Sequence, residues 1–354
     1  MPELAAALLP WFKLHGRHDL PWQQEPGPYR VWVSEIMLQQ TQVKTVIPYF
    51  NRFVERFPDT RALADAPLDQ VLHLWTGLGY YARARNLHRA AQVIVRDFAG
   101  SLPPDLDALM DLPGIGRSTA GAILVLGHGR RAPILDGNVK RVLTRCYGIY
   151  GWPGRREVNE RLWELAERET PHRETAAYTQ AIMDLGATVC TRSKPRCAAC
   201  PLVSACHAHR YGEQPLLPTG KAKKSLPVRQ VIFALLENEQ GEVLLQKRPP
   251  AGVWGGLWSF PEYRSQEELS GWISSRASLV SDEMTTLPQL RHSFSHFHLD
   301  ITPVRGMIRD KTVTIGDNET YLWYAPEHGP EIGMAAPVKA LIRDFWGQSK
   351  NIHR

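Results

Sequence analysis

Apolar residues in the first part of the chain recur every three or four positions, the spacing of amphipathic helices. A long span, Tyr29–Phe53, is interrupted mainly by Pro48. Glycine and proline gather between the helical spans, and strand-like alternation is hard to find. The other spans are Leu68–Trp75, Ala82–Asp97, Ser118–Leu126, Val139–Tyr147 and Val158–Glu169. Residues 1–210 are therefore expected to form an all-α domain.

The pattern changes near position 229. QVIFALLE and EVLLQKR flank NEQG, which predicts two strands joined by a hairpin turn. Strand-like runs follow at Phe294–Pro303 and Tyr321–Ala325, and a last helical stretch lies near Ala336–Phe345. Residues 229–350 should form a smaller α+β domain, which makes the protein multidomain. The stretch 211–228 is rich in proline, glycine and lysine, as linkers are.

Composition agrees with two folded domains. The chain has 354 residues, 43% of them hydrophobic and 22% charged, which excludes wholesale disorder. Its net charge of +6 suits a nucleic-acid partner, although many solvated surfaces are mildly basic. The first apolar run is short and broken by Pro10, Lys13 and Arg17, unlike a signal peptide, and no stretch is long enough to span a membrane. We expect a cytoplasmic protein with no membrane partner.

Four of the five cysteines follow the pattern C-x6-C-x2-C-x5-C. They are Cys190, Cys197, Cys200 and Cys206. A disulfide framework is unexpected without a secretory signal, whereas zinc and a [4Fe–4S] cluster both fit four thiolates. Only one CxxC pair is present, where zinc sites usually have two. Cys146 stands apart and is expected to be an ordinary buried thiol.

The segment LPGIG contains Gly114 and Gly116, which allow a sharp turn and a close approach of backbone N–H groups to an anion. On its own, this turn could also join two helices without further function. Beyond it, Asp136 precedes a predicted helix in ILDGNVKRV. Asp136 can be a helix cap. Asn138 can be a turn residue, or it can orient a carboxylate or a water by hydrogen bonding.

One acid stands in an apolar part of the span Tyr29–Phe53. On a continuous helix, Glu35, Gln39 and Gln42 would share one face, and such a stripe suits the polar edge of a base. Burial would raise the pKa of Glu35 and keep a proton available for a ring nitrogen. The alternative is a surface glutamate on an amphipathic helix.

The cysteine spacing and the turn between helices resemble the endonuclease III superfamily of DNA glycosylases, which have a helix-hairpin-helix core. The resemblance implies a [4Fe–4S] cluster on all four cysteines. It also implies that Asp136 faces the sugar of an extruded nucleotide, where a carboxylate stabilises oxocarbenium-like charge. The first interval of the cysteine motif is basic, so Arg192, Lys194 and Arg196 are expected to contact the DNA backbone, with a solvated loop as the alternative.

Longer segments narrow the resemblance. SEIMLQQTQV, LWTGLGYYARARNL, LPGIGRSTAGAIL and ILDGNVKRV are similar to the adenine DNA glycosylases of the MutY type, which flip out and remove adenine mispaired with 8-oxoguanine or guanine. The resemblance implies Glu35 as general acid and base, Asp136 as stabiliser of the sugar cation, and Asn138 as its support. Strand-cutting relatives carry a nucleophilic lysine where this chain has Ser118, so adenine release should leave an abasic site. An incidental Schiff base between Lys140 and the aldehyde of the abasic site stays an open alternative.

Other positions match family residues less specifically. Gln40 and Tyr80 match residues that enter the duplex beside the lesion base, although Tyr80 could also be a core aromatic. Gln180, Arg17 and Trp22 match positions near the adenine pocket. The expected partner is double-stranded DNA with an A:8-oxoguanine or A:G mispair, bound by a monomer at the bacterial nucleoid.

The C-terminal segment GEVLLQKRPPAGVWGGLWSFPE resembles the opening of a Nudix domain. Nudix hydrolases hold Mg²⁺ with an Arg-Glu-x-x-Glu-Glu run, which is missing after Glu262, so the fold is expected without that chemistry. In the MutY family this domain recognises 8-oxoguanine, and RHSFSHFHLDI matches the recognition loop. Phe294, Ser295 and His296 are the candidates, with an exposed strand edge as the alternative.

Three other functions compete with this one. A bifunctional glycosylase and lyase would need a lysine in place of Ser118. A diphosphate hydrolase would need the missing Nudix run. A non-catalytic DNA-binding protein would have no use for Glu35 and Asp136 together.

Overall fold

The computed structural model describes residues 2–221, 225–275, 284–308 and 320–346. Part of the predicted linker (222–224) and the end of the predicted C-terminal domain (347–350) lie outside these residues. Among the described residues, no helix has the length and apolar character needed to cross a bilayer.

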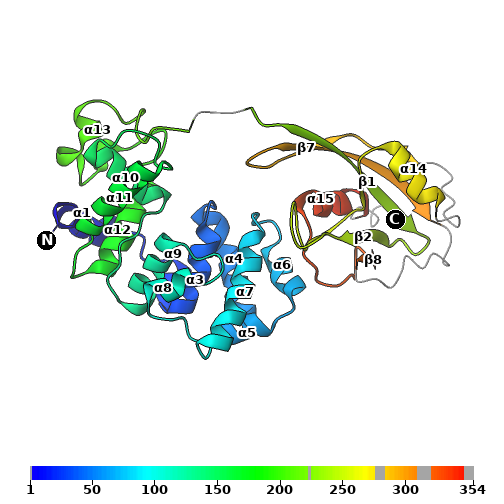
Figure 1. The fold of residues 1–354 in the computed structure, drawn as a ribbon, viewed down its shortest axis with the longest axis horizontal. Helices are drawn as coiled ribbons and strands as arrows, with labels where there is room; N and C mark the ends of the chain where they lie inside the picture. Colours follow the sequence, from blue (N-terminus) through cyan, green and yellow to red (C-terminus); the bar gives the residue numbers. More distant parts are fainter. Residues whose placement is uncertain (1, 222–224, 276–283, 309–319, 347–354) are drawn as a thin grey trace, which may run out of the picture. The chain divides into compact units, whose positions relative to one another are not determined.

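The chain packs as two compact units, and the elements of each are labelled in Figure 1. The first unit contains Met1–Asp65 and Asn86–Lys223, and the second contains Ala66–Arg85 and Lys224–Arg354. The segment Ala66–Arg85 therefore packs with the C-terminal residues, although the sequence pattern groups it with the helices around it. The predicted domain boundaries stay a prediction.

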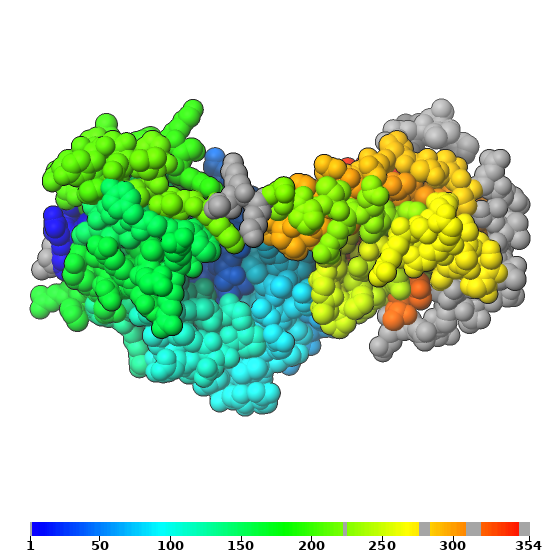
Figure 2. Space-filling model, turned by 45° about the horizontal axis from the view of Figure 1, so that its top comes forward, coloured from blue at the N-terminus to red at the C-terminus, as the bar shows by residue number. Residues whose placement is uncertain are grey.

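The first unit is helical, and none of its described residues forms a strand. Its core lies where the first helix meets three later ones, around Leu8, Leu143 and Leu185, which have no exposed surface. The short helix after the cysteine motif packs on α10, and Figure 2 shows this part in brighter green on the surface of the unit. The helices are α1 (Glu3–His15), α2 (Pro21–Gln24), α3 (Pro28–Leu38), α4 (Val43–Arg56), α5 (Thr60–Asp65), α7 (Ala82–Asp97, whose residues up to Arg85 belong to the second unit), α8 (Leu106–Met110), α9 (Arg117–Ala122), the π-helix η1 (Ile123–Gly127), α10 (Gly137–Tyr147), α11 (Arg156–Glu169), α12 (Thr175–Thr188), the 3-10 turns η2 (Cys197–Ala199) and η3 (Val203–Ala205), and α13 (His207–Arg210).

The predicted helical span Tyr29–Phe53 forms two helices and not one continuous helix. Helix α3 ends at Leu38, and α4 begins at Val43. Gln39 leaves the helical backbone with a ψ of 110°, and Gln42 precedes the first residue of α4. Gln39 and Gln42 therefore do not continue the helical face of Glu35, because the connection between the two helices reorients the chain.

The second unit is built on one mixed sheet with the strand order β3-β2-β1-β7-β5. The long central strands β1 and β7 run parallel, while β2 forms the predicted hairpin with β1. Helix α14, drawn in yellow in Figure 2, packs Leu269 into a core on the sheet. The elements are α6 (Leu68–Trp75), β1 (Val228–Asn238), β2 (Val243–Lys247), β3 (Trp258–Ser259), β4 (Glu262–Tyr263), α14 (Gln266–Ser274), β5 (Thr285–Thr286), β6 (Leu290–Ser293), β7 (His298–Ile308), β8 (Tyr321–Tyr324) and α15 (Ala336–Trp346).

The predicted strand Phe294–Pro303 begins too early. β6 ends at Ser293 and its antiparallel partner β7 begins at His298, so Phe294–Phe297 is the turn between them. The apolar residues Phe294 and Phe297 imitate a strand pattern, but they pack against each other within the turn. The 8-oxoguanine candidates therefore lie at a hairpin tip and not along a strand.

The segment Ala66–Arg85 is joined to the C-terminal part of its unit by side-chain contacts. Asp69 forms an ion pair with Lys247 at 2.9 Å. The Tyr81 hydroxyl donates to the Met334 carbonyl at 3.1 Å. These contacts place the residues around Tyr80 in the same compact unit as the sheet.

Candidate active site

Glu35 lies near the end of α3, between side chains that are almost completely buried. Trp32 and Met37 have no exposed surface, whereas Glu35 keeps a partial opening to solvent. Burial, and to a smaller extent the negative charge of Asp136, raises the pKa of Glu35 to about 8. At neutral pH this carboxyl is therefore mostly protonated, which agrees with the expected elevation and does not fit an ordinary surface glutamate.

Asp136 is the N-terminal cap of α10, and its Oδ1 accepts a hydrogen bond from the Val139 N–H at 2.8 Å. Asn138 Nδ2 donates to the other oxygen, Oδ2, at 3.2 Å, as the sequence suggested. Burial raises the pKa of Asp136, and these hydrogen bonds oppose the rise because they favour the charged form. Asp136 is thus both a helix cap and a carboxylate held in one orientation.

Ser118 supports the backbone that leads into Asp136. Its hydroxyl oxygen accepts a hydrogen bond from the Leu135 N–H at 3.0 Å. Lys140 follows one turn later in α10, and burial lowers its pKa while the charge of Asp136 opposes the change. The serine therefore has a structural contact of its own, next to the residue before the aspartate.

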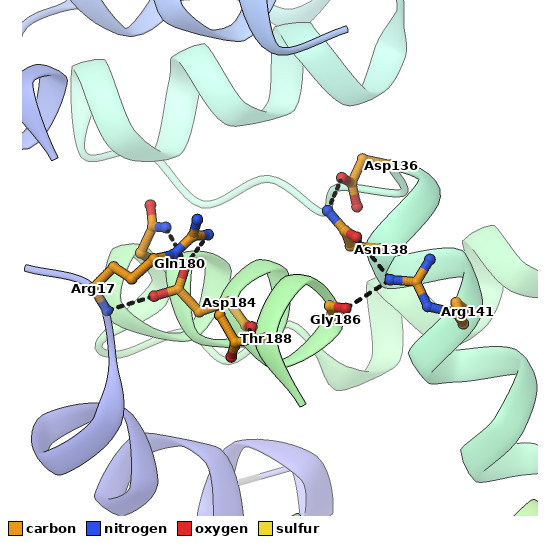
Figure 3. A network of polar contacts seen from close by, with 8 residues as sticks. All are labelled: Arg17, Asp136, Asn138, Arg141, Gln180, Asp184, Gly186 and Thr188. Carbon is orange, nitrogen blue, oxygen red and sulfur yellow. Dashed lines mark hydrogen bonds and ion pairs between the residues drawn. The ribbon is translucent and has the colours of Figure 1, made fainter. Parts of the chain in front are cut away.

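Arg141 extends this arrangement toward the cysteine motif (Figure 3). It donates from Nη2 to the side-chain oxygen of Asn138 at 2.8 Å and to the Gly186 carbonyl at 2.7 Å. Its Nε donates to the Cys190 carbonyl at 2.7 Å. A chain of hydrogen bonds thus runs from Cys190 through Arg141 and Asn138 to Asp136.

The second part of Figure 3 is centred on Asp184 of α12, which is almost completely buried. Asp184 accepts from the Arg17 backbone N–H at 2.7 Å and from its guanidinium at 3.0 and 2.5 Å. Gln180 Nε2 donates to the same carboxylate at 2.8 Å. Two candidates for the adenine pocket are therefore held by one carboxylate, while the third, Trp22, packs edge-on against Phe50 with ring centroids 5.4 Å apart.

The candidates for contact with the duplex have unusual backbone conformations. Gln40 (φ 58°) and Tyr80 (φ 51°) lie in the left-handed region that side-chain-bearing residues rarely adopt. Gln40 is exposed, and Tyr80 keeps 49% of its surface open, so Tyr80 is not a core aromatic. Gly114 has a φ of 82°, and a Cβ there would lie 2.8 Å from Asn86 Cβ. Gly116 precedes α9 with an ordinary φ of −94° and open space around it.

The four motif cysteines line one pocket in the first unit. Cys146 lines the same pocket, and its thiol is hydrogen-bonded to Cys206, so it is buried as predicted but not apart from the motif. Arg145 is buried beside it and donates to Cys190 Sγ at 3.4 Å. No three of the described His, Cys, Asp and Glu side chains converge on a single metal ion.

The three basic residues of the motif are exposed. Arg192, Lys194 and Arg196 extend from the surface between Cys190 and Cys197, and Arg196 also donates to the Thr188 carbonyl at 2.8 Å. Arg145 fixes this loop from inside, because it donates to the Thr191 and Arg192 carbonyls at 2.7 and 3.0 Å. The basic side chains therefore extend from a backbone that these hydrogen bonds hold in place.

In the second unit, Ser295 and His296 are exposed at the tip of the β6–β7 turn. Their side chains lie 3.4 Å apart, from the Ser295 hydroxyl to His296 Nδ1. Phe294, the residue before them in the same turn, is partly buried. All three candidates for 8-oxoguanine recognition thus belong to one turn.

The glutamates near the Nudix-like segment have other partners. Glu262 forms an ion pair with Arg248 at 2.6 Å. Glu268 accepts a hydrogen bond from the Arg264 N–H at 2.7 Å, at the start of α14. Both glutamates are therefore engaged in contacts within the second unit.

Arg141, Arg145 and Asp184 were not singled out by the sequence patterns. Their partners are mainly backbone carbonyls, or residues more than a hundred positions away along the chain. A basic residue on the buried side of α10 is the one signal that could have drawn attention to Arg145.

Family models match both parts of the chain. Residues 33–168 match the HhH-GPD superfamily of base excision DNA repair proteins, and residues 232–344 match the NUDIX domain. A solved thermostable thymine-DNA glycosylase superposes with a TM-score of 0.54 at 27% identity, covering 58% of this chain and 95% of that one. The predicted fold class, a helical glycosylase part followed by a Nudix-like α+β part, is confirmed.

Two relatives match most of the chain. The adenine DNA glycosylase of Buchnera aphidicola subsp. Acyrthosiphon pisum is 39% identical over 345 residues, or 98% of this chain and 97% of that protein. The human adenine DNA glycosylase is 31% identical over 406 residues, or 97% of this chain and 74% of that protein. The chain therefore belongs to the adenine DNA glycosylase family, hydrolases that remove adenine from DNA in base excision repair.

Proposed function

We propose that this glycosylase removes adenine mispaired with 8-oxoguanine or guanine, by flipping the adenine out of the duplex and cleaving its N-glycosidic bond with acid assistance. The observation that carries the proposal is a pair of carboxyl groups with different environments. Glu35 has a pKa of about 8, whereas the rise that burial causes in the pKa of Asp136 is opposed by hydrogen bonds that favour its charged form. One acid and one carboxylate are what this reaction requires.

In this mechanism, Glu35 gives its proton to a ring nitrogen of the extruded adenine. The bond between base and sugar then breaks with its electron pair moving to the base, which leaves as a neutral molecule. Asp136 stabilises the positive charge that develops on the sugar, and Asn138 holds it in position. Water adds to the sugar carbon, and Glu35, now a carboxylate, takes up the water proton and is restored.

Ser118 supports a monofunctional enzyme. A lyase needs an amine that attacks the sugar carbon, and the serine hydroxyl instead accepts a hydrogen bond from Leu135 N–H. The product is therefore an abasic site with an intact strand. A Ser118→Lys variant that gains strand cleavage would support this assignment.

Several exposed groups fit the DNA. Gln40 and Tyr80 combine exposure with a left-handed backbone, and such strain is typical of functional positions. Their side chains would fill the gap that the flipped adenine leaves in the base stack. Lys194 and its basic neighbours would pair with phosphates, and the open space at Gly116 would admit the DNA backbone.

In the Nudix-like part, Ser295 and His296 would bond the edge of 8-oxoguanine, with Phe294 next to them in the same turn. The proposal is supported by their exposure at one hairpin tip and by the Nudix-family match. Oxidation gives the base an N7–H donor and an O8 acceptor, and a hydroxyl or an imidazole can bond either one.

A [4Fe–4S] cluster fits the residues that line the cysteine pocket. Its four iron atoms are bound by four thiolates, and the four motif cysteines all line this one pocket. Arg145 and Gln214 donate to Cys190 Sγ at 3.4 Å and Cys197 Sγ at 3.9 Å, as expected around charged sulfur. The bound cluster would supply a fixed scaffold for the basic loop.

The reaction is tested with Glu35→Gln in single-turnover assays on A:8-oxoguanine, A:G and A:C duplexes. Adenine release should fall by about 10²-fold or more, while binding of the A:8-oxoguanine duplex survives. The control is Glu164→Gln on the exposed side of α11, which should behave like the parent protein. Normal release by Glu35→Gln would refute the mechanism, and strand cleavage without alkali would refute the monofunctional assignment.

The cofactor is tested on the purified protein. It should contain iron and inorganic sulfide in equal amounts and absorb visible light, and Cys197→Ser should lose both. A colourless protein that contains zinc and remains active would contradict the cluster.

A further inference from the structure

The turn that carries Ser295 and His296 rests on a stacked pair of aromatic rings. The Phe294 N–H donates to the Phe297 carbonyl at 2.9 Å and closes the turn. The two rings lie 4.6 Å apart with 23° between their planes. Phe297 is 1% exposed, so it anchors the turn in the second unit. The position of the exposed tip therefore depends on where the Phe294 ring is held.

Trp254 holds Phe294 from the side. Its ring centroid lies 5.4 Å from that of Phe294 and 5.4 Å from that of His292, and the last two rings are 4.7 Å apart. Trp254 is buried, and its φ of 54° is unfavourable for a bulky side chain. A tryptophan kept in a strained conformation is typical of a position where the placement of the ring matters more than local stability.

The loop that carries Trp254 is fixed on both sides of its backbone. A Cβ at Gly255 would lie 2.4 Å from the Pro250 carbonyl oxygen, so only glycine fits this fold of the loop. Arg85 Nη1 donates to the Gly255 carbonyl at 2.6 Å. Arg85 lies in the first turn of α7, shortly after Tyr80 in the sequence, and both residues belong to the second unit.

We propose that Trp254 is a positioning residue for recognition of the oxidised base, and that Arg85 fixes the loop from which it acts. This inference rests on the proposed role of the β6–β7 turn. Trp254 is too buried to read a base itself. It acts by holding Phe294, and thereby Ser295 and His296, at the place where they meet the lesion.

The expected signature is a change in selectivity. The contact with the tip uses groups that 8-oxoguanine has and guanine lacks. Loss of Trp254 should therefore slow adenine release opposite 8-oxoguanine and leave release opposite guanine nearly unchanged. The ratio of the release rate opposite 8-oxoguanine to that opposite guanine should fall about tenfold, because one well-placed base contact accounts for a discrimination of that size.

The experiment measures this ratio in single-turnover assays for Trp254→Leu, Trp254→Phe, Arg85→Met and Ser295→Ala. The control is Trp272→Leu, which removes a tryptophan of α14 that packs against the core of the sheet. Trp254→Leu and Ser295→Ala should lower the ratio, Arg85→Met should lower it less, and Trp254→Phe should restore part of it. Melting curves check that each variant folds. If Trp254→Leu does not fold, Arg85→Met and Trp254→Phe decide the question.

The outcomes separate this inference from the function on which it rests. If Ser295→Ala lowers the ratio and the Trp254 and Arg85 variants do not, the positioning role is wrong and the turn still reads the lesion. If none of the variants changes the ratio, the proposed role of the turn fails. If Trp272→Leu lowers the ratio as much as Trp254→Leu, the effect is general destabilisation and the inference is overturned.

Discussion

Replacing Glu35 by glutamine should stabilise the fold at neutral and alkaline pH while it removes activity. The raised pKa of Glu35, about 8 against an ordinary 4.5, comes first from burial and then from the charge of Asp136. In the unfolded chain, the same carboxyl loses its proton near its ordinary value. Between these pH values the folded protein holds a proton that the unfolded chain has released. The stability linked to this proton is complete below pH 4.5 and is lost as the pH rises toward 8.

The size of this effect follows from the width of that window. For each pH unit between the two pKa values, the free energy of unfolding falls by about 1.4 kcal/mol per proton. The total loss therefore has an upper limit of roughly 4 to 5 kcal/mol. Glu35 keeps a partial opening to solvent, which reduces the penalty, so a difference of about 2 kcal/mol is the expected result. Glutamine has nearly the same shape and does not ionise, so the variant avoids this loss.

The assay is urea unfolding of the parent protein and of Glu35→Gln at pH 5, 7 and 8.5, followed by circular dichroism. The free energy of unfolding of the variant, relative to the parent, should rise with pH. Glu164→Gln, on the exposed face of α11, should show no such trend. If Glu35→Gln and the parent lose stability in parallel, Glu35 ionises in the fold as it does in the unfolded chain. The assignment of Glu35 as a proton donor at neutral pH would then be wrong.

Three further outcomes follow from the first unit. Asp184→Asn removes the charge that pairs with Arg17, so stability should fall by about 2 kcal/mol and adenine release should slow; unchanged melting and release rates would show that this carboxylate is dispensable. Gly114→Ala should destabilise the protein by about 1 to 2 kcal/mol, because Gly114 has a φ of 82°. Gly116→Ala should melt like the parent, because Gly116 has a φ of −94° and open space around it. Equal melting temperatures for the two variants would contradict the turn geometry. Lys194→Ala should lower the slope of log K against log salt by about 0.9, and an unchanged slope in a DNA titration would remove this lysine from the phosphate contacts.

The local sequence pattern was sufficient to predict an element where that element packs through one apolar face. Helix α6 and helix α7 begin and end at the predicted residues, because regular apolar spacing and flanking glycine and proline mark both. The hydrogen bond from Asn138 to Asp136 was also predictable, since the two residues stand side by side at a helix start. The cysteine spacing predicted that four thiolates share one metal centre; the four side chains line one pocket, and the metal centre itself stays a prediction.

The sequence failed where a backbone conformation depends on distant contacts. The apolar spacing continues from α3 into α4, and it gives no sign that the chain turns at Gln39 and Gln40. A left-handed glutamine or tyrosine has no local signature, because the residue types that favour that conformation are glycine and asparagine. Phe294 and Phe297 were misread as strand residues because stacking within a turn repeats the apolar spacing of a strand.

The polar contacts that position the candidate active site share one physical property. Arg141 and Arg145 act on backbone carbonyls, and every residue has such an acceptor, so no partner type is written in the sequence. A guanidinium offers five donors in a rigid fork, which lets one arginine hold several segments at once. In α10 this means that the helix capped by Asp136 also holds the end of α12 and the cysteine loop. Asp136, the proposed catalytic carboxylate, and the proposed DNA-binding loop are therefore positioned by the same helix, so a change that moves one of them should also move the other.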